Sequence, residues 1–252
     1  MGRTYEIKDK NRLYEDEVPA HPVDISPFRM GATHVTVGMW REYLRGNSSL
    51  SMPTPTPWGW NDSHPMVNVS WFDIMGTDGK GGYAAWASRV AGVRLILPSE
   101  AQWEYVAKGG KQSKYPWGNE YDDSKVWCSV KTKRHSTAAV DRLNNVFANN
   151  FGVVDMSSNV TEWCLDGDRT YIKSFDRLGY VRTIKDPVGH IGEGWSRGVS
   201  WDDTGLEALR SSHRGGLTIL GLYDENEVVP FGFRLTAGSK LSLPNGVRIM
   251  GL

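Results

Sequence analysis

The two cysteines, Cys128 and Cys164, carry the most reactive side chains of this 252-residue chain. They are too few for a disulfide framework and lack the Cys-x-x-Cys spacing of a zinc site. A buried thiol is therefore the favoured interpretation of each. One bridge between them is the lesser alternative, because sequence does not show whether their Cβ atoms meet.

Other side chains that often do chemistry show no catalytic spacing. No two histidines stand at H-x-x-x-H or H-E-x-x-H, the spacings that place two imidazoles on one helical face. Residues 76–82 read GTDGKGG and lack the Gly-Lys-Ser/Thr of a phosphate-binding loop, and no G-x-S-x-G is present. The six histidines are His21, His34, His64, His135, His190 and His213.

Capping signals predict the helices that must position any site. We expect residues 83–87 to continue the helix that begins at Trp71, after the Gly-rich interruption at residues 76–82. Alternating residues predict a strand over Val23–Phe28, and after Gly110 we expect short strands and long loops. Three N-caps are expected: Thr36 before Val37–Arg45, Ser70 before Trp71, and Ser99, with Gln102 in a capping box, before a helix that ends at Gly109-Gly110.

Composition narrows the class of protein. Eleven Trp, ten Tyr and seven Phe predict an aromatic core, and 28 scattered Gly with 12 Pro rule out long helices. Equal numbers of basic and acidic residues disfavour nucleic acid as a partner. No apolar run approaches the roughly 20 residues of a membrane span, so we expect no transmembrane segment in this chain.

Several motifs resemble the formylglycine-generating-enzyme (sulfatase-modifying factor) family, in order and along nearly the whole chain. The resemblance implies one α+β domain over 1–252 with the irregular C-type-lectin-like fold. Such a domain has few short strands, two or three helices and long ordered loops. It also implies core or loop-anchoring roles for Trp71, Trp103, Trp117, Trp163 and Trp201. The motifs are PMVNVSWFD (65–73), RLILPSEAQWEYVAKGG (94–110), YPWG (115–118), FGVVDM (151–156), SNVTEW (158–163), RGVSW (197–201) and GFRL (232–235).

The chain departs from the oxidising members of that family in the segment after RGVSW. Those members carry a copper-binding cysteine pair there, whereas residues 202–233 contain no cysteine. Copper–thiolate chemistry has no substitute among Ser, Asp or His. We therefore expect no copper and no enzymatic activity. The chain also begins at the lectin-like domain, without the histidine iron site of the carbon–sulfur-bond-forming relatives.

The resemblance implies one structural calcium site. Its positions are Asp155, the carbonyls of Ser158 and Val160, and Glu162, whose oxygens suit a hard cation. The alternative, equally weighted, is that Glu162 and Asn159 only brace the loop through hydrogen bonds. A second family site falls near Lys125 and Lys133, where positive charges predict its absence.

An apolar concentration without helical or alternating spacing lies between RGVSW and GFRL. Apolar residues in loops suggest a contact surface. The arrangement resembles the variable proteins of bacterial diversity-generating retroelements, a treponemal protein among them. In these proteins adenine mutation diversifies a C-terminal ligand-binding region, here 197–235. The alternative is that Leu220, Leu222 and Val229 are core residues. Positions that fit the diversified set are Val199, Asp202, Leu206, His213, Leu217, Ile219, Gly221, Leu222 and Tyr223.

Three functions follow from these patterns. The first is a non-catalytic display protein that binds a protein or other macromolecule. The second is a metal-dependent enzyme related to the formylglycine-generating or sulfoxide-synthase enzymes. The third is an inactive structural homologue. For the first function we expect a monomer, and the resemblance implies a cell-surface or secreted location, with a removed lipoprotein leader as one route.

Overall fold

Four α-helices, three 3-10 helices and nine short strands make up the regular structure described by this computed structural model. The described residues are 1–4, 15–76, 81–129, 135–141, 148–166, 183–186, 195–216 and 230–238. None of the helices within these ranges is long and apolar enough to cross a membrane. The helices are η1 (Glu15–Glu17), α1 (Val37–Arg45), α2 (Trp71–Met75), α3 (Tyr83–Ala91), α4 (Glu100–Ala107), η2 (Asp123–Lys125) and η3 (Leu206–Leu209).

The three predicted N-caps are confirmed. The Thr36 hydroxyl accepts a hydrogen bond from the backbone N–H of Met39, and α1 spans the predicted residues. Ser70 forms a capping box with Asp73 at the start of α2, and Ser99 forms one with Gln102 at the start of α4. Each cap satisfies N–H groups that a helix leaves without partners in its first turn.

The helix expected after Ser70 is two separate helices, α2 and α3. The described residues therefore contain four α-helices, where two or three were predicted. Gly76 follows α2 with a φ of 90°, which a right-handed helix cannot contain. The α3 helix begins after Gly82 without a side-chain cap and ends at Gly92 in the left-handed conformation.

The strands form three small sheets. The order β7-β6-β4-β8 places β7 and β8 at opposite edges of the four-stranded sheet, while β2-β9-β3 and the parallel pair β1-β5 form the others. The strands are β1 (Val23–Asp24), β2 (Arg29–Met30), β3 (Leu95–Ile96), β4 (Thr161–Trp163), β5 (Ile184–Lys185), β6 (Trp195–Arg197), β7 (Gly215–Gly216), β8 (Phe231–Gly232) and β9 (Thr236–Ala237).

The predicted strand over Val23–Phe28 was too long, because only its first two residues pair. The backbone N–H and the hydroxyl of Ser26 both donate to the carboxylate of Asp186, at 2.6 Å each, instead of to a strand. Pro27 has no N–H to donate.

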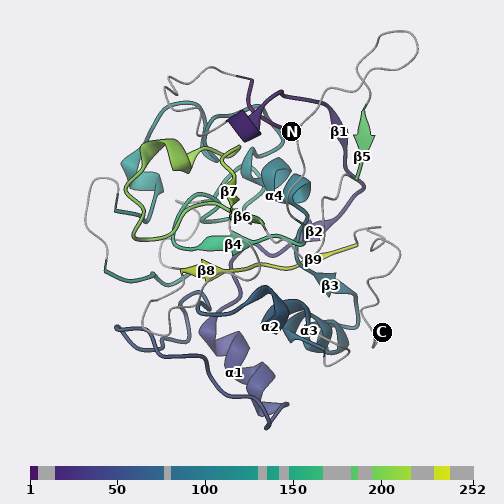
Figure 1. The fold of residues 1–252 in the computed structure, drawn as a ribbon, viewed down its shortest axis with the longest axis vertical. Helices are drawn as coiled ribbons and strands as arrows, with labels where there is room; N and C mark the ends of the chain where they lie inside the picture. Colours follow the sequence, from purple (N-terminus) through teal and green to yellow (C-terminus); the bar gives the residue numbers. More distant parts are fainter. Residues whose placement is uncertain are drawn as a thin grey trace.

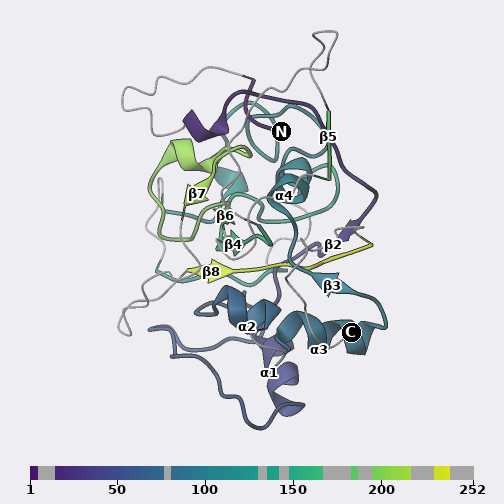
Figure 2. The same ribbon diagram turned by 45° about the vertical axis from the view of Figure 1, so that its right-hand side comes forward.

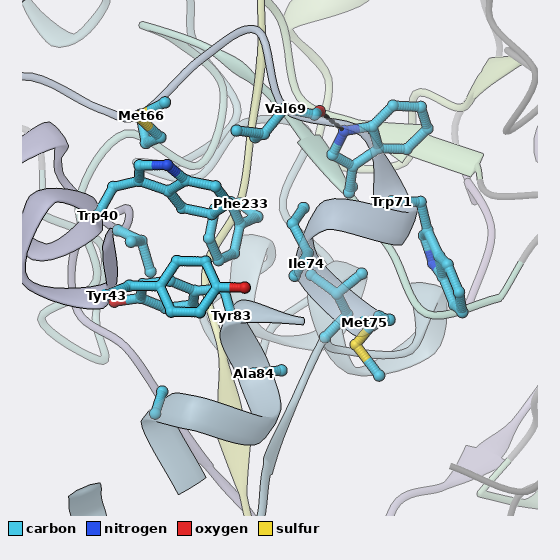
Figure 3. Close-up of a cluster of buried hydrophobic side chains, with 14 of the residues drawn as sticks. Trp40, Tyr43, Met66, Val69, Trp71, Ile74, Met75, Tyr83, Ala84 and Phe233 are labelled. Atoms are coloured by element: carbon cyan, nitrogen blue, oxygen red, sulfur yellow. Dashed lines mark hydrogen bonds between the residues drawn. The ribbon is translucent and has the colours of Figure 1, made fainter. Parts of the chain in front are cut away.

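Aromatic side chains form the main core, as the composition predicted (Figure 3). Trp40 of α1 stacks on Tyr83 of α3 with ring centroids 5.2 Å apart, and Tyr83 meets Phe233 edge to face at 5.3 Å. In both views α1, α2 and α3 lie on one side of β8 and β9, and α4, β6 and β7 lie on the other (Figures 1 and 2). The main core therefore joins α1, α2 and α3 to β8 and to Phe233, which directly follows β8.

The tryptophans of the motifs take the structural places expected of them. Trp71, Trp103 and Trp163 are buried, and Trp117 and Trp201 are half-buried. The indole N–H of Trp163 donates to the carbonyl of Val69, and that of Trp71 to the carbonyl of Cys164.

Candidate functional site

Three buried arginines hold residues 197–216, the first part of the predicted ligand-binding region 197–235. Arg214 binds Glu100 through two nitrogen–oxygen contacts of 2.5 and 2.9 Å, and its guanidinium lies 4.4 Å from the ring centre of Trp195. We call these arginines and their glutamate partners the first clamp. It comprises Arg197 with Glu104, Arg210 with Glu17, and Arg214 with Glu100.

The first clamp combines side chains from η1, from α4 and from the stretch that runs from β6 to β7. Glu100 and Glu104 lie one turn apart on α4, Glu17 ends η1, Arg197 ends β6, and Arg210 follows η3. All six side chains of the clamp are almost completely buried. Buried ion pairs tolerate the loss of one partner poorly, because the other charge is left without compensation. The clamp therefore fixes residues 197–216 to the helical core.

The charges of the clamp set the protonation of its glutamates. Burial acts to raise the pKa of Glu104, but the charges of Lys108 and Arg197 outweigh burial and hold this pKa well below its ordinary value. Burial likewise opposes the ionised form of Glu17, and contacts with His213 and Arg210 outweigh it, so its pKa is lowered. Both glutamates are therefore ionised at neutral pH.

A second clamp, formed by Arg234, Glu162 and His34, holds the chain where it follows β8. Arg234 donates to both carboxylate oxygens of Glu162, at 2.7 and 2.8 Å, and His34 Nε2 lies 3.1 Å from Glu162 Oε1. The second clamp is fully buried. Burial opposes ionisation of Glu162, yet Arg234 and His34 lower its pKa to about 2.

The two clamps belong to one sheet. Arg197 and Glu162 are paired across the inner strands β6 and β4, while Arg214 immediately precedes edge strand β7 and Arg234 follows the opposite edge strand, β8. Both edge strands can be followed in Figure 1. The described parts of the chain therefore form a frame that is fixed at both ends of residues 217–229.

The predicted ligand positions fall into three groups. Val199 is buried with Cys128 and Leu209, so it packs in the core and offers no contact surface, contrary to its inclusion among the ligand-binding positions. Asp202 and Leu206 are exposed, and His213 is half-buried, 3.8 Å from Glu17. Five further positions lie outside the described residues: Leu217, Ile219, Gly221, Leu222 and Tyr223.

Sequence reasoning missed an aromatic pair next to Asp202. Trp58 meets Trp201 edge to face with ring centroids 5.1 Å apart, although 142 residues separate them in the chain. Backbone contacts hold Trp201, which donates to the Asn159 carbonyl and accepts from the Ser129 hydroxyl. The Pro-rich composition of residues 51–60 was the only signal that this loop had a fixed course.

The residues of the predicted calcium site contact one another and Arg234. Asp155 accepts from the Ser158 hydroxyl at 2.8 Å and from the Asn159 amide at 3.2 Å, while Glu162 faces Arg234. The Ser158 carbonyl accepts from the N–H of Val160. Among the described residues no three His, Cys, Asp or Glu side chains converge as metal ligands. These contacts favour the alternative in which Glu162 and Asn159 brace the loop through hydrogen bonds.

The two cysteines are buried thiols and do not form a disulfide. They belong to different core clusters, Cys164 with Trp103 and Met156 and Cys128 with Val199 and Leu209. Burial raises the pKa of Cys164 well above its usual range, and a protonated thiol is a poor metal ligand. The Cys164 thiol therefore does not fit a copper ligand.

Comparison with known proteins identifies the fold. Formylglycine-generating enzymes of Thermomonospora curvata and Streptomyces coelicolor are 33 and 26% identical in alignments of 114 and 205 positions, and these alignments cover 41 and 60% of this chain. The chain covers 34 and 62% of their lengths. The inactive C-alpha-formylglycine-generating enzyme 2 of Mus musculus is 35% identical over 69% of this chain and 49% of its own.

Two solved structures share the fold over most of their length. PvdO from Pseudomonas aeruginosa gives a TM-score of 0.68 at 24% identity, covering 94% of this chain and 89% of its own. Treponema denticola variable protein 1 gives 0.63 at 20% identity, covering 86% of each chain. The model of the sulfatase-modifying factor enzyme 1-like domain matches residues 2–234. The chain therefore belongs to the family of sulfatase-modifying factor enzyme 1-like domains.

Proposed function

We propose that this chain is a non-catalytic binding domain that presents residues 217–229, together with Asp202, Leu206 and His213, to a protein ligand. The observation that carries the proposal is the pair of clamps. Buried arginines fix the described chain on both sides of this stretch, and we infer that the frame tolerates changes in the residues between them. Changes in those residues then alter recognition while the frame is kept.

Two further observations support a binding role. Asp202 and the half-buried Trp58–Trp201 pair lie at the start of the segment, and tryptophan is enriched among residues that dominate binding energy. The absence of cysteine from residues 202–233 removes the ligands and redox groups of the oxidising relatives. A related fold in a variable protein and an inactive mammalian relative are consistent with this role.

Replacement of residues 217–229 by a Gly/Ser segment of equal length tests the frame. We expect the melting temperature to fall by no more than about 5 °C, because both clamps remain. The Arg234→Met variant is the matched control and should unfold far below the parent chain. Failure of the replaced chain to fold would show that the segment belongs to the core.

The display role itself is tested by comparing genes from closely related strains. We expect substitutions to concentrate at exposed positions of residues 202–223, with an adenine-rich template repeat nearby. Even divergence along the chain would contradict the proposal. Stoichiometric copper or iron in the purified protein, together with oxygen consumption, would support the enzymatic alternative instead.

A further inference from the structure

A cavity of about 510 Å³ opens among α1, α2 and residues 49–53. The buried rings of Trp40 and Tyr43, from α1, line it together with Phe72 of α2 and the loop residues Leu50 and Met52. In Figures 1 and 2 these helices lie on the opposite side of β8 from β7 and η3. Its size falls within the roughly 300–1,000 Å³ of small-ligand sites, whose walls are largely apolar and aromatic.

The polar groups of the cavity offer acceptors. Asp73 receives the backbone N–H and the hydroxyl of Ser70 on Oδ2, at 2.8 and 2.7 Å, and no donor among the described residues reaches its Oδ1. The amide nitrogen of Asn47 donates to the carbonyl of Tyr43, so the Asn47 side chain also presents a carbonyl oxygen. A ligand that brings hydrogen-bond donors satisfies both oxygens.

Asp73 is the one acidic side chain among the described residues that line the cavity, and it is exposed. Burial first, and the charge of Asp73 second, raise the pKa of the Tyr43 hydroxyl, while the charge of Arg89 acts to lower it. Aromatic faces of Tyr and Phe attract cations through their ring quadrupoles, which adds to the pull of the carboxylate.

From these features we propose that the cavity binds a small organic cation, a primary ammonium carried on an aromatic or aliphatic body. The ammonium donates to Asp73 Oδ1 and to the Asn47 carbonyl, and the body packs against Phe72, Leu50 and Met52. None of the described residues that line the cavity belongs to 202–229.

Three probes of matched size test the proposal by calorimetry or ligand-observed NMR: phenethylamine, 2-phenylethanol and 3-phenylpropionate. We expect phenethylamine to bind at least about tenfold more tightly than the alcohol, because a charge-assisted hydrogen bond replaces a neutral one. The carboxylate should not bind. Equal binding of amine and alcohol, or no amine binding at about 10 mM, would overturn the proposal.

Two variants locate the site independently. Asp73→Asn keeps an acceptor for Ser70 and removes the charge, and Phe72→Ala removes a ring that is 38% exposed. Each should weaken phenethylamine about tenfold. The matched controls are Asp122→Asn, an exposed cap that also binds a serine N–H and hydroxyl, and Phe151→Ala, a ring 47% exposed. Controls that weaken the amine equally would refute this location.

The chain with residues 217–229 replaced separates this inference from the proposed function. It should bind phenethylamine as the parent does. Loss of amine binding in a folded replaced chain would place the cation site at the display segment and contradict the cavity assignment.

Discussion

Arginine side chains connect parts of the chain that are far apart in sequence. Arg210 reaches Glu17 across 193 residues, Arg214 reaches Glu100 across 114, and Arg234 reaches Glu162 across 72. A guanidinium presents five donors in a planar fork, so one side chain can bind a carboxylate and backbone carbonyls together. Arg234 does so, donating also to the carbonyls of Gly31 and Val154.

Replacement of Arg214 by methionine tests the first clamp. The variant leaves the buried Glu100 carboxylate with Arg197, at 3.5 Å, as its remaining cationic neighbour among the described residues. We expect the free energy of unfolding to fall by about 3 kcal/mol, measured by guanidinium titration. Adding Glu100→Gln should recover part of the loss.

The control for this variant is Arg45→Met, which removes an exposed pair with Glu42 and should change stability by less than about 1 kcal/mol. Equal losses in the two single variants would contradict the clamp.

At this scale the sequence did not predict the ion pairs. The quoted motifs contain Arg197, Arg234, Glu100, Glu104 and Glu162, but nothing in them marked these side chains as buried partners, and Glu17, Arg210 and Arg214 lie outside every motif. Charged residues are rarely buried without a partner, and the partner is chosen by the fold. Val199 was predicted to bind ligand but is a core residue, because residue type alone could not distinguish a core position from a displayed one.

Among the elements, helices were the better predicted because their signals are local. Thr36, Ser70 and Ser99 each stand next to the helix they cap, so neighbouring residues suffice. Two-residue strands such as β1 depend on partners elsewhere in the chain, β5 in this case. No alternating pattern can mark a strand of two residues.

The turn from Asp155 to the start of β4 at Thr161 is the element on which the calcium prediction is tested. Its carboxylates already bind Ser158, Asn159 and Arg234. We therefore expect the same melting temperature in excess calcium and in excess chelator. A calcium-dependent rise would show that the turn rearranges to coordinate the ion, since a ligand of the folded state raises its stability.

On the scale of the whole molecule, ionised buried glutamates make stability depend on pH. Folding lowers the pKa of Glu162 from 4.5 to about 2, so its contribution is present above pH 4.5 and is lost as the pH falls toward 2. Glu17 and Glu104 act in the same direction. Burial raises the pKa of Asp16, so this residue acts in the opposite direction.

We expect the free energy of unfolding to decrease steeply between about pH 4.5 and pH 2, by up to about 3 kcal/mol from Glu162 alone. Unfolding titrations across this range measure the slope. Glu162→Gln should be less stable at pH 7 and show a shallower slope. An unchanged slope in that variant would mean that Glu162 is not ionised in the folded chain.

The sheet order has a consequence for chain length. Strands β7 and β8 are three strand spacings apart, or about 14 Å, whereas the chain from Gly216 to Phe231 can reach about 50 Å when extended. The connection is thus several times longer than the gap it closes, and doubling the length of a flexible loop costs only about 0.6 kcal/mol. Under the proposed function, the frame therefore admits changes in the length of the segment between Gly216 and Phe231 as well as changes in its residues.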